Sequence, residues 1–285
     1  MLFIASLAMA AATLVDSVSS PLNDYNLSVD ARGRTMVFAR SEADFRNARI
    51  FIATRSGQAR GEAAPIGFSD PRWSDSDPWL TPDGNTLYFI STRPAEGREA
   101  GRADYDVWRS SRTATGWSAP EHLGPEVNGR GQELGPELHH GILYFSSARR
   151  SGRGGLDIYA ARASGPGFGP AALVDGPFNS AASDSDFTLS RDGRAALFWR
   201  SGEGGTGTIH VARRSAAGWS EPEPLSAAIN HGPFNFTPSF SRDGRSITYA
   251  STRARDGQLA GLADVYRAAL PAAPAGAGRR SARAR

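Results

Sequence analysis

The chain has 285 residues, of which 40% are hydrophobic and 21% charged, as is usual for a globular protein. It has no apolar run of about 18 residues, which excludes a transmembrane helix, and no cysteine, which excludes disulfides and thiolate metal sites. The net charge of the whole chain is +3, and the basic tail, residues 271–285, contains four arginines. The rest of the chain therefore has no excess of positive charge, unlike a typical nucleic-acid-binding domain.

The first segment, residues 1–12, predicts a secretory signal peptide. Leu2 to Met9 form a short apolar run, and Ala8-Met9-Ala10 fits the small-x-small pattern of a cleavage site. The positively charged start of such a signal is absent, so an apolar strand of the mature fold is the alternative. We expect a periplasmic or secreted protein that is monomeric, although the sequence does not fix its oligomeric state.

A turn followed by an apolar-aromatic strand recurs five times along the chain. The equivalent aromatic residues, spaced 51, 56, 53 and 51 residues apart, are Phe38, Phe89, Phe145, Phe198 and Tyr249. Each unit adds a preceding short strand, a third strand with period-two alternation and, in the first four, a proline-bearing outer strand. Four short strands repeated around a ring predict an all-β, five-bladed β-propeller of antiparallel blades over residues 13–270.

The repeat gives blade boundaries and a way to close the ring. We expect blades at about residues 25–74, 75–132, 133–183, 184–234 and 235–270. The fifth unit has no outer strand of its own, and the spacing of the other outer strands points back to Leu14, with Val18 aligned on Ile229. Residues 13–19 are therefore predicted to complete the last blade, beside 263–270.

Charged residues flank the hairpin between the second and third strands of each unit. Unit four lacks both charges and unit one exchanges them, which predicts contact within each pair and a structural role for it. The expected pairs are Arg93 with Asp106, Arg149 with Asp157, Arg253 with Asp264, and Glu42 with Arg49.

Acidic residues also recur where the inner strands begin. The residues at this register are Asp24, Asp75, Glu133, Asp184 and Asn235, and two positions further on come Asn26, Asp77, Asp186 and Thr237. Carboxylates that converge on one axis attract a cation or a cationic peptide. The alternative is interblade hydrogen bonding without a ligand. We predict no cofactor and no resident metal, with a cation at this channel mouth as the open possibility.

Signatures of catalysis are scarce in the rest of the chain. There is no G-x-S-x-G motif, and the His139-His140 pair occupies a hairpin turn. The glycine- and arginine-rich loops 94–103, 150–155, 202–207 and 254–263 are candidates for a recognition surface. If the axial carboxylates were catalytic, Asp24, Asp75, Glu133 and Asp184 would be the candidates for a glycoside hydrolase.

The stretches "SDPWLTPDGNTLYFISTRP", "YDVWRSS", "GWSAPEHLGPEVN" and "GILYFSSARRSGRGGLDIYAAR" resemble the TolB-type, WD-like propeller repeats of bacterial envelope proteins. The resemblance implies an interaction platform, commonly periplasmic, whose partner is a protein or a cell-wall component. TolB itself has a further N-terminal domain and six blades, so its own function does not carry over. We expect a non-enzymatic binding module, with a carbohydrate-active enzyme as the alternative.

Overall fold

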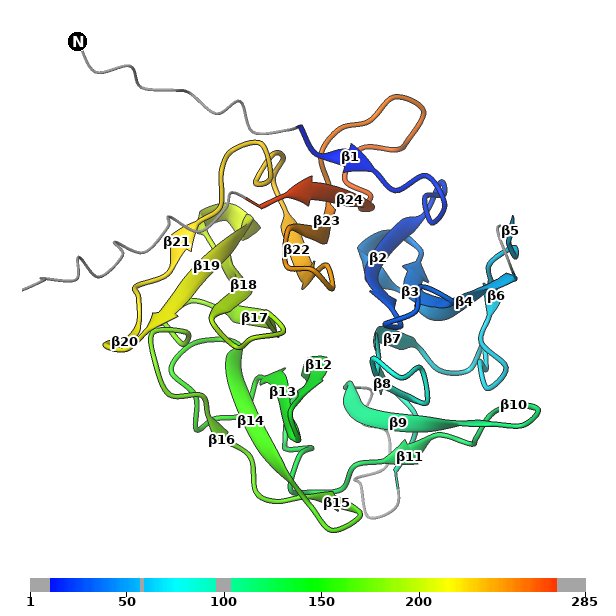
Figure 1. The fold of residues 1–285 in the computed structure, drawn as a ribbon, viewed down its shortest axis with the longest axis horizontal. Coiled ribbons are helices and arrows are strands. Elements are labelled where there is room, and N and C mark those ends of the chain that lie inside the picture. Colours follow the sequence, from blue (N-terminus) through cyan, green and yellow to red (C-terminus); the bar gives the residue numbers. More distant parts are fainter. Residues whose placement is uncertain (1–10, 57–58, 96–103, 271–285) are drawn as a thin grey trace, which may run out of the picture.

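The computed structural model describes residues 11–56, 59–95 and 104–270, and within them the chain forms five antiparallel sheets arranged as blades around a central axis (Figure 1). The predicted five-bladed propeller is confirmed. The predicted signal peptide falls almost wholly, and the basic tail wholly, outside the described residues. No described helix is long and apolar enough to cross a bilayer.

Blades 1 to 4 have the same order of strands, and the fourth strand of each is split into two short segments that both pair with the third. Blade 1 comprises β2 (Asn23–Val29), β3 (Thr35–Ser41), β4 (Arg49–Ser56), β5 (Ala59–Arg60) and β6 (Ala64–Pro65). Blade 2 comprises β7 (Asp75–Leu80), β8 (Thr86–Ser91), β9 (Asp106–Thr113), β10 (Gly116–Trp117) and β11 (Glu121–His122). Blade 3 comprises β12 (Glu133–His139), β13 (Ile142–Ser147), β14 (Asp157–Ser164), β15 (Gly167–Phe168) and β16 (Ala172–Leu173). Blade 4 comprises β17 (Asp184–Leu189), β18 (Ala195–Ser201), β19 (Gly207–Ser215), β20 (Gly218–Trp219) and β21 (Glu223–Pro224).

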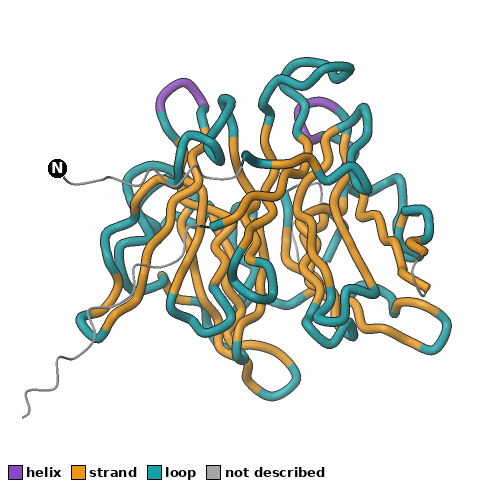
Figure 2. Tube along the Cα trace, turned by 45° about the horizontal axis from the view of Figure 1, so that its top comes forward, coloured by secondary structure: helices purple, strands orange, loops and turns teal. Residues whose placement is uncertain are grey.

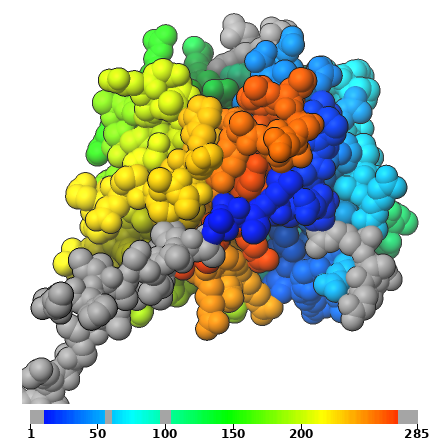
Figure 3. Space-filling view, turned by 90° about the horizontal axis from the view of Figure 1, so that it is seen from above, coloured from blue at the N-terminus to red at the C-terminus, as the bar shows by residue number. Residues whose placement is uncertain are grey.

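The fifth blade is closed by the N-terminal strand. It comprises β22 (Asn235–Phe240), β23 (Ser246–Ser251), β24 (Asp264–Ala269) and β1 (Thr13–Leu14). Leu14 pairs with Tyr266, and the blue N-terminal segment lies against the orange and red last blade (Figure 3). Val18 and Ile229 are both 1% exposed, as expected of aligned positions. The predicted closure by the N-terminal strand is therefore confirmed.

Apolar faces stacked between blades form the core. The five repeated aromatic residues are all buried, and the clusters that contain Phe89 and Phe145 each combine side chains of two adjacent blades. Tight turns join the first and second strands: Asp83, Asp192 and Asp243 each accept a hydrogen bond from the backbone two residues on, which holds the glycine at positive φ.

The two faces of the ring differ in their connections. Inner strands begin on what we call the upper face and end on the lower face, where the turns to the second strands lie. The 3-10 turns η1 (Ala43–Phe45) and η2 (Glu203–Gly205) link second and third strands and project from the same end of the molecule, the upper face (Figure 2).

Candidate functional site

The acidic residues that begin the inner strands are buried and already paired. Asp24, Asp75, Glu133 and Asp184 are at most 1% exposed. Each carboxylate contacts an arginine of the second strand of its own blade or of the loop that follows it, and these arginines are Arg40, Arg93, Arg149 and Arg200. In blade 5 the equivalent Asn235 instead contacts Ser251 and two backbone carbonyls. This ring is a set of neutralised ion pairs.

The same arginines also bind the connection that enters each blade. One guanidinium nitrogen donates to a carbonyl at an equivalent position in all five blades, namely that of Val18, Phe68, Val127, Phe178 or Ile229. The arginine therefore fastens the inner strand to the segment that precedes it. This explains why Arg253 is present in blade 5 although that blade has no inner carboxylate.

The predicted partners of these arginines are wrong, although their structural role is present. Arg93 donates to Asp75 and not to Asp106, because its side chain turns toward the inner strand and the buried carbonyl of Phe68. Among the ion pairs of the described residues, the expected pairs Arg149–Asp157, Arg253–Asp264 and Glu42–Arg49 do not occur either.

The aspartates that open the third strands hold the loops before them or the outer strand. Asp157 accepts from the backbone N–H groups of Arg153 and Gly154, at 2.7 and 3.0 Å. Asp264 pairs with Arg255 at 2.6 Å. The carboxylate of Asp106 contacts the His122 ring at 2.9 Å.

Burial changes the pKa values of the inner ring despite these partners. Burial raises the pKa of Asp24 and of Asp75, against the lowering effect of Arg40 and Arg93. Burial raises the pKa of Glu133 to about 7, although the Ser147 hydroxyl and the charge of Arg149, 3.2 Å away, both lower it.

A second ring lies further along the axis, at a bulge shared by all five inner strands. The pairing register shifts in each blade around one residue with φ between 48° and 55°, and these residues are Asn26, Asp77, Gly135, Asp186 and Thr237. Asparagine, aspartate and glycine tolerate this left-handed conformation best. The bulge turns these residues inward, so the recurring polar residues of the sequence meet at the axis.

Adjacent blades are hydrogen-bonded through this axial ring. Asp77 accepts from the N–H of Gly135 at 2.9 Å, and Asp186 accepts from the N–H of Thr237 at 3.0 Å. The Thr237 hydroxyl accepts from the N–H of Asn26 at 3.4 Å. A Cβ at Gly135 would lie 2.7 Å from Asp186 Oδ1, so glycine is required where the two carboxylates flank one residue.

Burial raises the pKa of both axial carboxylates, Asp77 and Asp186. The negative charge of Asp77 raises the pKa of Asp186 further.

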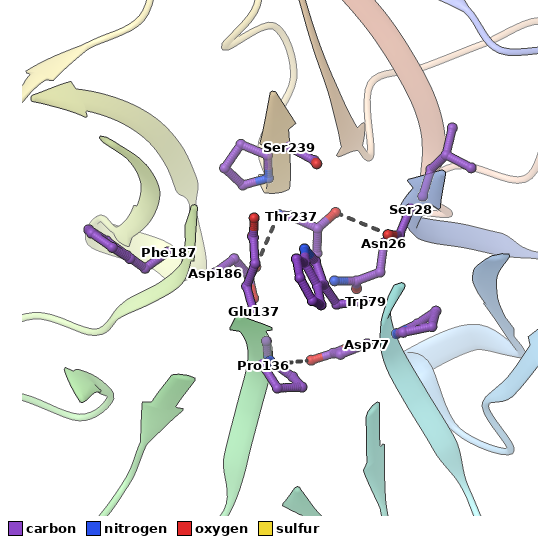
Figure 4. Close-up of a pocket in the computed structure, with 14 residues that line it drawn as sticks. Asn26, Ser28, Asp77, Trp79, Pro136, Glu137, Asp186, Phe187, Thr237 and Ser239 are labelled. Carbon is purple, nitrogen blue, oxygen red and sulfur yellow. Dashed lines mark hydrogen bonds between the residues drawn. The ribbon is translucent and has the colours of Figure 1, made fainter. Parts of the chain in front are cut away.

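A narrow cavity of about 30 Å³ lies between this ring and the lower face (Figure 4). Asp77, Asp186, Trp79 and Glu137 line it, and Glu137 is held by the His139 ring at 2.7 Å and the Thr188 hydroxyl at 2.9 Å. This volume holds water molecules or one ion, whereas cavities for small organic ligands measure roughly 300–1,000 Å³. No group of three His, Asp or Glu side chains that fits a metal occurs in the described parts of the chain.

Exposed apolar residues gather on the upper face. Among the described residues, four large hydrophobic side chains are exposed, and three of them, Leu22, Phe45 and Leu259, lie in upper-face loops of blades 1 and 5. The loops are joined there: Asn23 donates to the carbonyl of Glu42 and accepts from the N–H of Ala263.

Behind this patch, an aromatic cluster reaches from blade 1 to blade 4. Its members, with successive ring centroids 4.8–5.5 Å apart, are Tyr25, Phe45, Phe236, Phe234 and Trp199. Three of the predicted recognition loops, 150–155, 202–207 and 254–263, do lie on this face, whereas residues 96–103 of the fourth fall outside the described residues.

Three parts of this arrangement were not predicted from the sequence. Glu137 and Trp79 are single-blade residues and carry no repeat signal. Gly135, in the stretch "ELGPEL", occupies the same position in its unit as Asp77 and Asp186. The repeat could therefore have identified it as a member of the axial ring. Phe45 occurs in the degenerate first unit, whose loop the alignment did not match.

Comparisons with known proteins support the fold. No protein-family model and no curated protein matches the sequence. Among solved structures, a putative TolB from Agrobacterium tumefaciens is similar with a TM-score of 0.54 and 13% identity, covering 93% of this chain and 99% of that one. TolB from Acinetobacter baumannii is similar with a TM-score of 0.52 and 14% identity over 89% of this chain, which spans only 56% of that TolB.

An enzyme shows the same degree of similarity. The endo-arabinase from Bacteroides thetaiotaomicron VPI-5482 has a TM-score of 0.54 and 14% identity, covering 92% of this chain and 98% of that one. At such identities the likeness extends to the fold alone. The chain is thus a five-bladed propeller whose fold is similar to that of two TolB proteins and of an endo-arabinase.

Proposed function

We propose that this chain is a non-enzymatic, exported binding module that uses its upper face to bind a protein partner in the cell envelope. The observation that carries the proposal is the patch of Leu22, Phe45 and Leu259, three of the four exposed large apolar side chains of the described residues, on one face. Contiguous exposed apolar residues mark interaction sites in soluble proteins.

The aromatic cluster supplies a rigid base for such a contact. Phe45 packs edge-on against Tyr25 and Phe236, so its position is fixed while 37% of its surface stays exposed. Large aromatic anchors of this kind dominate the energy of many interfaces. The likeness to TolB proteins agrees with an interaction role.

The test compares two substitutions on the upper face with one on the lower face. Leu22→Ser and Leu259→Ser together should weaken binding of an envelope partner at least about tenfold, because both side chains leave the interface core. Val29→Ser is the matched control, since Val29 is 43% exposed on the opposite face. The partner is captured from envelope extract with each variant, and its affinity is then measured by calorimetry with the purified components. Equal capture by the double variant and the wild type contradicts the proposal.

The alternative is a carbohydrate-active enzyme, favoured by the likeness to the arabinase and by three carboxylates, Asp77, Glu137 and Asp186, around the axial cavity. Two observations weigh against it. The carboxylates that begin the inner strands already bind arginines, and the cavity is about tenfold smaller than a small-molecule site. If the wild type hydrolyses any member of a glycan panel and Asp77→Asn does not, the protein is an enzyme.

The cation expected at the inner-strand starts remains a prediction. An arginine on each of four carboxylates lowers the attraction for a further positive charge. Calorimetry with calcium, repeated on Asp184→Ala, tests it directly.

A further inference from the structure

The lower face carries an uneven distribution of positive charge. The turns between first and second strands in blades 4, 5 and 1, which are consecutive around the ring, each contain two exposed arginines. We call this set the arginine crescent, and its members are Arg191, Arg194, Arg242, Arg245, Arg32 and Arg34. The equivalent turns of blades 2 and 3 contain no arginine.

The turns do not need these arginines. Blade 2 forms the same turn with "PDGN", in which Asp83 accepts from the Thr81 hydroxyl and from the N–H of Asn85. In blade 4, Asp192 makes the same two bonds with Ser190 and Arg194. Only backbone atoms of the arginine take part in that turn, so its side chain is not explained by folding.

The arginines of the crescent are not held in close ion pairs, although hydrogen bonds within the turns, and also the charges of Arg194 and Arg245, lower the pKa of Asp192 and Asp243 in the same turns. In the described ranges of the chain, none of its six guanidinium groups forms an ion pair with a carboxylate. The neighbouring turn aspartates direct their oxygens to backbone N–H groups of their own turns.

Hydrogen bonds link the turns of blades 5, 1 and 2 across the lower face. Arg242 donates to the carbonyl of Ala31 at 2.7 Å, and the N–H of Ala31 donates to the carbonyl of Pro82 at 2.8 Å. The arginine-bearing turns of blades 5 and 1 are therefore in direct contact.

We propose that the lower face binds the headgroups of an anionic phospholipid bilayer through the arginine crescent. A guanidinium group can bind two phosphate oxygens at once, and each arginine near the surface adds to the binding free energy for an acidic membrane. An extended array over three blades fits a broad surface better than one small anion, and the axial cavity, which opens toward this face, is lined by carboxylates that would repel an anion. The crescent presents no aromatic side chain on which nucleic-acid bases could stack, which disfavours a nucleic acid.

The test is cosedimentation of the full chain with vesicles of phosphatidylcholine alone or with about one third phosphatidylglycerol. Binding is expected only with phosphatidylglycerol at about 0.1 M salt, and it should be lost at about 1 M salt, where the screening length falls from about 10 to about 3 Å. Equal binding to both kinds of vesicle would show that lipid charge does not matter, as expected if the apolar residues 2–9 cause the binding, and would overturn the proposal.

Matched triple variants localise the effect. The first variant combines Arg34→Asn, Arg194→Asn and Arg245→Asn, so that each turn has the asparagine that the blade 2 turn has at this position. Binding should weaken by about 100-fold, because each arginine contributes about a factor of five. The control is Arg46→Asn, Arg130→Asn and Arg150→Asn, the same charge change at exposed positions on the upper face. An equal loss in both triples, at equal thermal stability, overturns the assignment to the lower face. Tighter binding to duplex DNA than to acidic vesicles overturns the choice of lipid.

Discussion

Arg93 and Asp75 form a double hydrogen bond, with Nη1–Oδ1 2.7 Å and Nη2–Oδ2 2.8 Å, at a site where the carboxylate is 1% exposed. Bidentate pairs of this kind are among the strongest polar contacts in proteins, and breaking a buried one leaves a charge without a partner. Asp75→Ala should therefore lower the free energy of unfolding by about 3 kcal/mol, as measured by urea denaturation. Asp70→Ala, which removes the partner of the exposed Arg72, is the control and should change little; a similar loss in both variants would contradict the role assigned to burial.

Glu133 should make the protein less stable as the pH rises toward neutrality. Its pKa in the folded state is about 7, above the usual 4.5, so between these values the folded state keeps a proton that the unfolded state has released. The resulting stability is complete below about pH 4.5 and is lost as the pH rises through 7. Glu133→Gln removes this dependence and should be more stable than the wild type at pH 8 by up to about 3 kcal/mol.

Thermal unfolding of wild type and Glu133→Gln from pH 4 to 8 measures the difference. Asp184→Asn, the equivalent change in blade 4, is the control. There Arg200 and the backbone and side chain of Ser180 all bind the carboxylate, so the substitution should destabilise. An unchanged pH slope in Glu133→Gln would rule out Glu133 as the source.

The axial ring should not tolerate a side chain at Gly135. Gly135→Ala combines a positive φ with a Cβ placed 2.7 Å from Asp186 Oδ1, and should cost about 3 kcal/mol of stability. Gly193→Ala is the matched control, because Gly193 has a φ of 66° and open space around it, and it should cost about 1 kcal/mol. Denaturation midpoints compare the two; equal costs would mean that backbone strain alone matters.

The segment around Val18 should be needed for ring closure. A chain that starts at Thr13 should keep the stability of the full chain, whereas one that starts at Ser20 loses β1 and the buried Val18 and should melt at a clearly lower temperature. Val18→Ala tests the packing alone, with an expected loss of about 2 kcal/mol. Identical melting of the two truncated chains would show that closure contributes nothing.

The architecture was predictable from the sequence because five units repeat the same turn and aromatic strand. The position of Leu14 beside residues 263–270, where it pairs with Tyr266, followed from the spacing of the outer strands. The number of blades and the closure of the ring both depend on features that every blade needs, and these features therefore recur at a regular spacing in the sequence.

The ion pairs were not predictable because the arginine occupies two different positions. In blades 1 and 4 it stands directly across from the acid, as in Asp24↔Arg40, whereas in blades 2 and 3 a serine stands there and the arginine follows two residues later. Both positions bring the guanidinium to the same carboxylate. When the five units are compared at one fixed position, units one and four therefore have no arginine there. For this reason the third-strand aspartates were predicted as its partners.

The closing contact joins residues about as far apart in the chain as the described part allows: the Thr13 hydroxyl bonds the carbonyl of Arg267, 254 positions away. The ribosome makes β1 before every other described strand and β24 after all of them, so the ring cannot close until all five blades have been synthesised.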